Sequence, residues 1–191
     1  MRSICGVVVA VVSAVAAYWL VGKIFAHLHA PAELKEWQSR TVAGVVVDSP
    51  GEFKTMPLNF GDAQKMIDKV DAFKCEASGF EIDVVRIHYK PDVQLSLDGA
   101  VNGMASSVGA LEGVKNLKNT AEATTVSGKP AKRVSLTGDR TLDGKSGVIH
   151  VEGVLIADGQ TFYEVEATFD SSNPRGAEYA ARMAQSVKLA Q

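Results

Sequence analysis

Four carboxylates on strand-like stretches are the side chains best placed to do chemistry. Glu152, Glu164 and Glu166 occupy two stretches that are joined by an Asp-Gly signal for a two-residue hairpin turn. The three glutamates are therefore expected on paired strands, where they could form an acidic patch with Asp83. Such a patch is a candidate interaction face for a partner, although a solvated strand face is the commoner explanation of such residues.

The histidines and cysteines lack the spacing of a metal site or a nucleophile site. His88 and His150 fall on predicted strands, and the chain contains no H-x-x-x-H or C-x-x-C pair and no G-x-S-x-G elbow. Cys75 is predicted to be a small core residue. We therefore predict no catalytic, cofactor-binding or metal-binding residue and expect a protein that is not an enzyme. An enzymatic alternative would need a polar cluster around His150 and Glu152.

The N-terminal stretch has the length and composition of a membrane span. No charged residue occurs from Ile4 to Gly22. At about 1.5 Å per residue this stretch would be about 28 Å long, close to the ~30 Å hydrocarbon core of a bilayer. Lys23 follows it and could snorkel to the interface. We predict a transmembrane signal-anchor helix over residues 1–25, which contacts the lipid bilayer through Ile4, Val8, Val12, Val15, Tyr18 and Trp19.

The sequence leaves two fates open for this segment. A cleaved signal peptide would use Ala14-Val15-Ala16 as its A-x-A site, but the cut would leave an apolar new N-terminus. A second possible site is the Ala30-Pro31 bond, which the proline disfavours. We therefore favour a retained, single-pass anchor. The short N-terminal tail favours an N-terminus inside, which places the C-terminal domain in the periplasm or an equivalent exported space.

The rest of the chain has the composition of one globular domain without affinity for nucleic acid. The 191 residues carry a net charge of −2, and residues 1–25 contribute Arg2 and Lys23, so the remainder is near −4. This part has no basic stripe that could bind phosphates. About 150 residues suffice for a single core. We predict an anchor over 1–25, a juxtamembrane stalk over 26–40 and one domain over 41–191.

Strand signals dominate the first part of this domain. In the stretch from Phe80 to Lys90, apolar residues fall on both faces, so a strand there is expected to be covered on both sides. Pro57 restricts its own stretch to the edge of a sheet. The expected elements are a strand over 41–48, an edge strand over 52–60, a loop over 61–65, and a hairpin of 66–76 with 80–90.

Two helices and a second set of strands follow. Asp98 is the predicted N-cap of a helix over 99–112. Its core-facing stripe is Val101, Met104, Val108 and Leu111. A last helix is expected to start at Asn173-Pro174 and to bury Tyr179, Met183 and Val187. The strands expected between these helices cover residues 116–127, 131–137, 147–157 and 161–169.

The last of these strand pairs has a predicted register. A two-residue turn at Asp158-Gly159 would pair Val154 with Tyr163. Glu164 and Glu166 would then share the other face with apolar residues, so neither face is purely apolar. We therefore expect this hairpin to be central and covered on both faces.

The order of elements predicts an α+β domain in which a twisted antiparallel sheet is flanked by helices. The pattern resembles the PsbP-like group, which includes DcrB-like envelope proteins, over about residues 41–190. The resemblance implies a non-enzymatic α/β/α sandwich that serves as an accessory, assembly or binding module, with no shared catalytic residues. The stretches that carry it are Asp48-Ser49-Pro50-Gly51, Gly128-Lys129-Pro130-Ala131, the hairpin from Gly153 to Phe169 with Tyr163, and Ala184-Gln185-Ser186-Val187-Lys188.

Two functions agree with these observations. The first is a membrane-anchored accessory or structural subunit of a larger membrane protein complex, because small residues along the span permit close approach to other transmembrane helices. The second is an exported ligand- or peptide-binding module, with a cleft expected beneath the helix that carries Val101 and Leu111. The expected partners are the lipid bilayer and integral membrane subunits.

Overall fold

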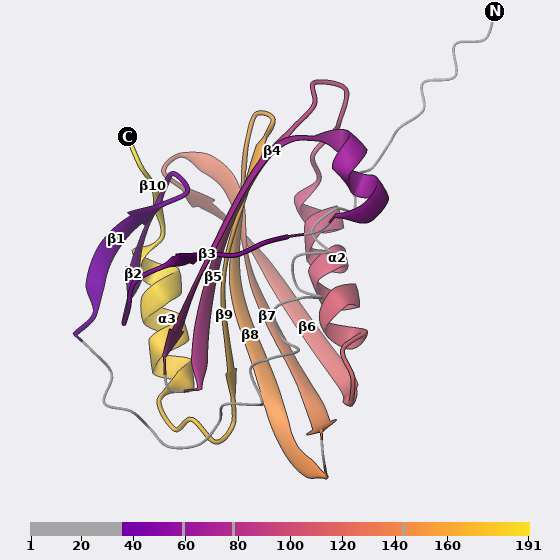
Figure 1. Ribbon diagram of the computed structural model, residues 1–191, viewed down its shortest axis with the longest axis vertical. Helices are drawn as coiled ribbons and strands as arrows, with labels where there is room; N and C mark the ends of the chain where they lie inside the picture. Colours follow the sequence, from indigo (N-terminus) through magenta and orange to yellow (C-terminus); the bar gives the residue numbers. More distant parts are fainter. Residues whose placement is uncertain (1–35, 59, 78, 143) are drawn as a thin grey trace, which may run out of the picture.

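The computed structural model describes residues 36–58, 60–77, 79–142 and 144–191, and these form an α+β fold with antiparallel strands. In this part of the chain, one sheet has the order β3-β4-β5-β9-β8-β7-β6 and a second has the order β1-β2-β10 (Figure 1). The strands are β1 (Gln38–Val42), β2 (Val45–Ser49), β3 (Lys54–Thr55), β4 (Ile67–Ala77), β5 (Phe80–Tyr89), β6 (Val114–Val126), β7 (Lys129–Leu142), β8 (Lys145–Asp158), β9 (Thr161–Asp170) and β10 (Lys188–Leu189).

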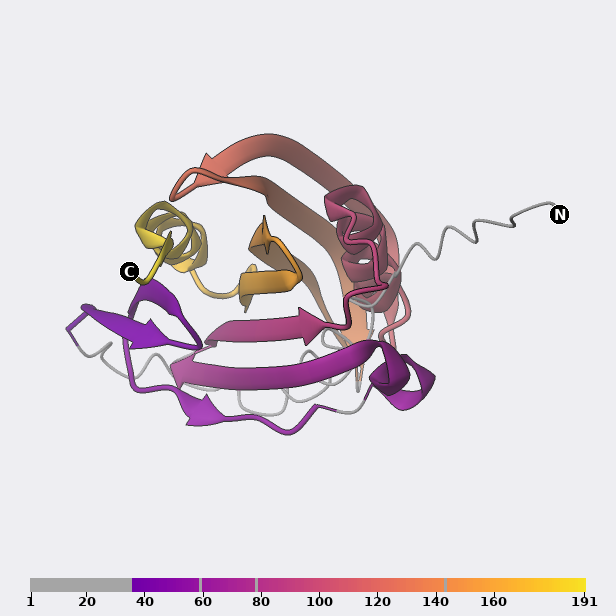
Figure 2. The ribbon, with the colours of Figure 1, turned by 90° about the horizontal axis from the view of Figure 1, so that it is seen from above.

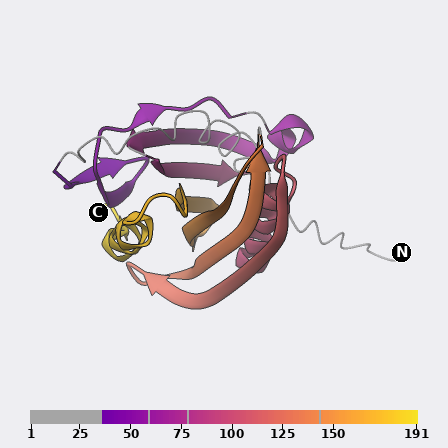
Figure 3. The same cartoon turned by 90° about the horizontal axis from the view of Figure 1, so that it is seen from below.

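Helices cover both faces of the larger sheet. The helix α2 (Leu97–Gly109) packs over β6, β7 and β8, while α3 (Gly176–Ser186) packs over β8 and β9 and against β2. A short 3-10 helix, η2 (Gly61–Met66), precedes β4. Figures 2 and 3 show the large sheet bending around α3, with β1 and β2 beside that helix. The small sheet and α3 therefore close one face, and α2 lies on the other.

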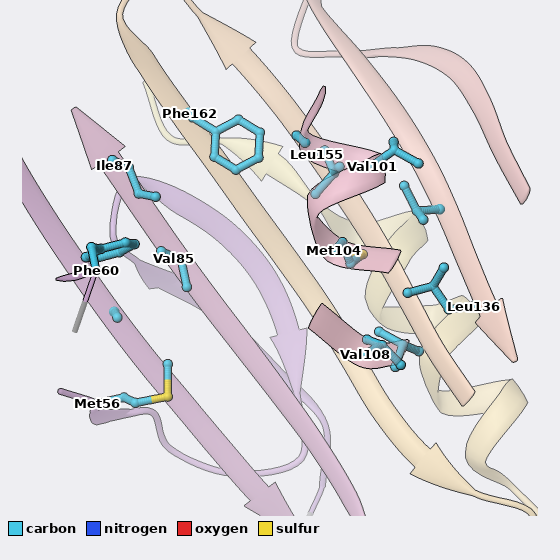
Figure 4. Close-up of a cluster of buried hydrophobic side chains, with 14 of the residues drawn as sticks. Met56, Phe60, Val85, Ile87, Val101, Met104, Val108, Leu136, Leu155 and Phe162 are labelled. Atoms are coloured by element: carbon cyan, nitrogen blue, oxygen red, sulfur yellow. The ribbon is translucent and has the colours of Figure 1, made fainter. Parts of the chain in front are cut away.

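Two hydrophobic clusters hold these layers together. The cluster on the α2 face includes Met56, Phe60, Val85, Ile87, Val101, Met104, Val108, Leu136, Leu155 and Phe162 (Figure 4). The cluster on the α3 face includes Val45, Val47, Cys75, Phe80, Ile82, Val154, Val165, Phe169, Tyr179 and Met183. Each fully buried large apolar side chain contributes about 1.5–3 kcal/mol. The sheet is thus an interior layer, which confirms that the central strands are covered on both faces.

The predicted anchor over residues 1–25 and most of the predicted stalk lie outside the described residues. No helix among residues that the structure describes is long and apolar enough to cross a membrane. Of the stalk range 26–40, residues 36–40 are described, and Gln38–Arg40 lie within β1. Trp37 packs on the domain, with its ring 6.1 Å from that of Phe80 and 5.4 Å from that of Tyr179.

Several predicted elements have different boundaries in the structure. The stretch 41–48 is not one strand, because a tight turn at Ala43-Gly44, with φ values of 50° and 80°, folds it into the β1–β2 hairpin. The edge strand predicted over 52–60 shrinks to β3, and the loop over 61–65 is η2. β4 and β5 form the hairpin that was predicted over residues 66–76 and 80–90.

The N-cap of α2 is Ser96 and not Asp98. The Ser96 hydroxyl accepts a hydrogen bond of 3.1 Å from the Gly99 amide, which starts the helix two residues earlier than predicted. The predicted stripe of Val101, Met104, Val108 and Leu111 is buried, as expected.

The β8–β9 hairpin turns at Gly159-Gln160. This turn pairs Val154 with Val165, so the register differs by two residues from the prediction. Side chains alternate with a period of two, and a shift of two residues therefore leaves every side chain on its predicted face. The prediction of the faces is confirmed, although the pairing was wrong.

Candidate functional site

Buried carboxylates on β5 and β9 form the most unusual polar group of the described chain. Asp83 lies directly opposite Glu166 in the register of these two strands. Asp83 points to the same face of the sheet as Val85, two residues further along β5, and Glu166 points to the same face as Phe162 on β9. Val85 and Phe162 belong to the cluster on the α2 face, so both carboxyls lie on that face. We call Glu81, Asp83, Glu164 and Glu166 the carboxyl cluster. Each of these residues is at most 4% exposed.

The carboxyl cluster has few stabilising partners. Lys74 lies on β4 with its Nζ 3.8 Å from Glu81 Oε2. Among the described residues, both oxygens of Asp83 and of Glu164 lack a partner of the usual kind, a backbone or side-chain N–H or hydroxyl. Their nearest polar neighbours are other carboxyls: Asp83 lies beside Glu81 and Glu166, and Glu164 lies beside Glu166. The cluster therefore brings carboxyl groups together without a full set of neutralising partners.

Burial is the main cause of the raised pKa values in this cluster. It raises the pKa of Glu81 to about 7, with a contribution from the neighbouring Glu76. It also raises the pKa of Glu166 to about 7. The pKa values of Asp83 and Glu164 are raised well above their ordinary values by burial and by the adjacent carboxyls. Desolvation disfavours the charged form of each acid, and a nearby like charge adds to this effect.

The carboxyl cluster can store protons, but its burial separates it from any substrate. General acid–base chemistry requires a carboxyl within hydrogen-bond reach of the reacting atom. The side chains of Asp83 and Glu164 are each 1% exposed, so a dissolved molecule cannot reach them in this conformation. No group of acidic, histidine or cysteine side chains within the described residues has the arrangement of a metal site.

The acidic patch predicted from the sequence is divided between the two sides of the sheet. Glu164, Glu166 and Asp83 come together on the α2 face, but they are buried and do not form the expected surface patch. Glu152 lies on the opposite face, where its Oε1 accepts a hydrogen bond of 2.7 Å from the Ser135 hydroxyl. Alternation along each strand separates Glu152 from the other two glutamates, because the β8–β9 register places it opposite Ala167.

The other candidate residues have structural surroundings. The ring of His150 stacks on that of Phe169 with the centroids 4.9 Å apart. His88 Nδ1 lies 3.0 Å from Thr161 Oγ1 across the β5–β9 pair. Cys75 is buried in the α3 cluster, and burial raises the pKa of its thiol. These surroundings agree with the core and sheet positions predicted for the three residues.

An open groove lies beside β1. It has a volume of about 560 Å³, within the usual range for binding sites. Phe53 and Phe73 contribute apolar surface and are themselves packed against the α3 cluster. Arg40 brings a guanidinium group to the same groove. The complete lining is Ser39, Arg40, Thr41, Val42, Ala43, Glu52, Phe53 and Phe73.

Sequence reasoning missed this groove. The prediction of one strand over 41–48 concealed the β1–β2 hairpin, and it left Ser39 and Arg40 in the stalk. The usable signal was Ala43-Gly44, because a glycine between β-branched stretches marks a tight turn.

The hollow that the described residues form beside α2 is far smaller than the cleft that was expected beneath this helix. The hollow nearest the start of the helix has a volume of about 10 Å³ and is lined by Tyr89, Leu95, Ser96, Leu97, Ala100, Ala157 and Phe162. One water molecule requires about 10–15 Å³. Met104 fills the space deeper under the helix, where its Cε would lie 3.2 Å from a Cβ placed on Gly153. Among the described residues, these observations give no support to a ligand site beneath α2.

A bent antiparallel sheet with a helix on each face defines the class of this domain, which is the Mog1/PsbP-like fold. The solution structure of cyanobacterial PsbP (CyanoP) from Synechocystis sp. PCC 6803 is similar to the chain with a TM-score of 0.53 and 12% sequence identity, over 81% of this chain and 91% of that chain. This likeness confirms the PsbP-like fold that the sequence predicts.

Two other solved structures are similar to the chain at lower scores. LpqN, involved in cell envelope biogenesis of Mycobacterium tuberculosis, matches with a TM-score of 0.44 and 11% identity, over 82% of this chain and 90% of that chain. The Saccharomyces cerevisiae Ran-binding protein Mog1p matches with a TM-score of 0.48 and 10% identity, over 81% of this chain and 96% of that chain. No protein-family model and no curated protein sequence matches the chain.

Proposed function

We propose that this protein is a membrane-anchored, non-catalytic accessory subunit whose domain docks on a larger membrane protein complex. The domain would lie in the periplasm or an equivalent exported space, with residues 1–25 as its anchor. The observation that carries the docking role is the open groove beside β1, which lies at the edge of the small sheet. An exposed sheet edge can bind a strand from another chain.

A second candidate is the exported peptide-binding module. The same groove favours it, because backbone groups at a strand edge bind an extended peptide irrespective of whether the peptide belongs to a membrane subunit or is free. The two candidates differ in the partner's location. A ligand-binding version that depends on a cleft beneath α2 has no comparable observation in its favour.

Site-specific photocrosslinking in intact membranes tests the docking role. A photoreactive amino acid at Thr41, in the groove, is expected to capture a discrete integral membrane protein. The matched control carries the same group at Thr120, an exposed position on β6. Capture of a soluble peptide alone at Thr41 would favour the second candidate. Equal and diffuse crosslinking at both positions would contradict docking at this edge.

A further inference from the structure

The outer edge of β1 has backbone groups without partners among the described residues. β1 pairs on one side only, with β2, and Val42 pairs with Val45 across the two-residue Ala43-Gly44 turn. In such a hairpin the residues that flank the turn are hydrogen-bonded to each other, and the bonded pairs then alternate along the strand. The N–H and C=O groups of Ser39 and Thr41 must therefore point outward, along the groove.

Arg40 gives this edge a charge preference. Its Nη2 donates a hydrogen bond of 3.2 Å to Gln38 Oε1, while its buried Nε has no acceptor among the described residues. Within the described ranges, no carboxylate lies at ion-pairing distance from Arg40. A guanidinium that is partly removed from water binds a carboxylate more strongly than an uncharged group. A carboxylate that entered the groove would thus gain a charged partner and satisfy the free donor.

The groove also provides an apolar surface next to the charged group. Phe53 and Phe73 are partly buried, and they expose the rest of their rings where the groove passes between β1 and β4. Side chains of an added strand alternate between its two faces. A strand paired with β1 could therefore direct one side chain to Arg40, and the side chains two positions away, on the same face, toward these phenylalanines.

The outer edge of β6, at the end of the large sheet in the described structure, is protected against such pairing. β6 is bordered by β7 alone, and it carries Lys115, Lys118 and Glu122 as exposed charges. Its register is also shifted between Lys115 and Lys118. Charges and bulges are common means by which edge strands avoid association. β1 has no bulge in its pairing with β2 and has one charged side chain, Arg40, which faces the groove.

We infer that the β1 edge binds an extended peptide segment that carries a carboxylate side chain flanked by apolar or β-branched residues. The backbone of the segment would bond to Ser39 and Thr41, the carboxylate would pair with Arg40, and the apolar side chains would contact Phe53 and Phe73. This inference rests on the proposed function and names the kind of segment that a partner presents.

Three blocked seven-residue peptides test the inference on the full chain in detergent micelles. The first alternates threonine and valine around a central glutamate, the second has glutamine at the centre, and the third is the glutamate peptide with N-methylated backbone amides. Binding is measured by fluorescence anisotropy of labelled peptides. The glutamate peptide should bind at least about tenfold more tightly than the glutamine peptide, which corresponds to about 1.4 kcal/mol. The N-methylated peptide should lose binding, because it cannot donate hydrogen bonds to the edge.

The Arg40→Gln variant is the matched protein control. It should bind the glutamate and glutamine peptides equally, with a thermal unfolding curve that verifies its fold. Equal affinity of the wild-type chain for these two peptides would overturn the role of Arg40, and undiminished binding of the N-methylated peptide would overturn strand pairing. The N-methylated probe leaves the protein unchanged, so this part of the test holds even if Arg40→Gln fails to fold. Crosslinking at Thr41 to a membrane protein would still support the docking role after either failure.

Discussion

At the scale of single residues, the carboxyl cluster makes the stability of the domain depend on pH. Glu81 and Glu166 have pKa values of about 7 in the folded protein, against an ordinary value of 4.5. The folded state therefore binds more protons than the unfolded state between these values. Stability from these groups is fully present below about pH 4.5 and is lost as pH rises through about 7.

The wild-type domain is thus expected to lose stability from pH 5 to pH 8. A pKa increase of this size corresponds to a change on the order of 3 kcal/mol for one carboxyl over that window. The groups that face the cluster include Lys74 and Glu76 on β4, and Lys74 offsets part of the effect at Glu81. Urea unfolding, followed by circular dichroism, measures the free energy of unfolding at each pH. A free energy of unfolding that increases toward pH 8 would contradict the assignment.

The Asp83→Asn substitution should weaken this dependence. Asn has nearly the shape of Asp, carries no charge and has an amide that can donate a hydrogen bond to a neighbouring carboxylate. At pH 8 we expect the variant to be more stable than wild type by about 1–3 kcal/mol, because Asn removes the cost of burying an acid that is ionised in the unfolded chain. At pH 5 the difference should be smaller than at pH 8, because the cost of burying the acid grows as pH rises above its ordinary pKa. The control is Asp92→Asn at an exposed site, which should leave the pH profile unchanged.

At the scale of secondary-structure elements, hydrogen bonds at helix ends decide boundaries that residue patterns alone do not. Ser96 and Asp98 are both good N-cap residues and lie two positions apart. The structure selects Ser96, whose hydroxyl accepts from the Gly99 amide, while Asp98 is in the first turn and pairs with Lys132 across to β7. Ser96→Ala should therefore lower the free energy of unfolding by about 1 kcal/mol, and Asp98→Ala by about 0.5 kcal/mol or less. If chemical denaturation showed the larger loss of free energy of unfolding for Asp98→Ala, Asp98 would be the N-cap.

The docking of α3 on β9 depends on a close approach at Gly176. A Cβ at this position would lie 2.2 Å from Phe169 Cδ2, so Gly176→Ala forces the ring or the helix to move. We expect a loss of about 1–3 kcal/mol from overpacking. Gly147→Ala is the control, because its Cβ would meet one atom, Ser171 Oγ, at an ordinary 3.9 Å. Equal melting temperatures for the two variants would show that α3 adapts without cost.

The sequence predicted the elements with strong periodicity and missed those set by local turn chemistry. The stripe of α2 and the alternation in β5 and β9 identified the buried faces, because each follows directly from helix or strand geometry. The β1–β2 hairpin was not predicted because Ala43 adopts a φ of 50°, a left-handed conformation that few alanines adopt. The sequence predicted that both faces of the β8–β9 hairpin are covered, but it did not show that Glu81 and Asp83 would be buried beside Glu164 and Glu166, since this depends on the pairing of β5 with β9.

At the scale of the whole molecule, the fold separates a buried carboxyl cluster on the α2 face from an open groove beside the α3 face. The large sheet lies between them as an interior layer, with β4 and β5 contributing to both sides. Trp37 begins the described fold and is held by Tyr179 and by the guanidinium of Arg182, 5.0 Å from the Trp37 ring. The chain therefore enters the domain next to α3, on the same side as β1.

This entry point connects the groove to the predicted anchor. Residues 1–25 remain predicted as a transmembrane helix with the N-terminus inside, and ten residues separate the end of this range from Glu36. A segment of that length spans at most about 36 Å when fully extended. With the anchor retained, β1 would lie within that distance of the bilayer, where membrane subunits could reach it. A cleaved anchor would remove this constraint.

Cysteine labelling tests the topology with a control that the fold supplies. Cys75 is 2% exposed, so a folded domain should not react there with a membrane-impermeant maleimide. Glu122→Cys places a thiol at an exposed position on β6, in a chain whose Cys5 is replaced by Ser. In spheroplasts of cells that express the chain, the new thiol should react with the maleimide added outside. Cys75 should react only after the domain has been denatured. Labelling of Glu122→Cys that requires membrane permeabilisation would place the domain in the cytoplasm. An N-terminal sequence that begins at Ala17 or later would show that the anchor is cleaved.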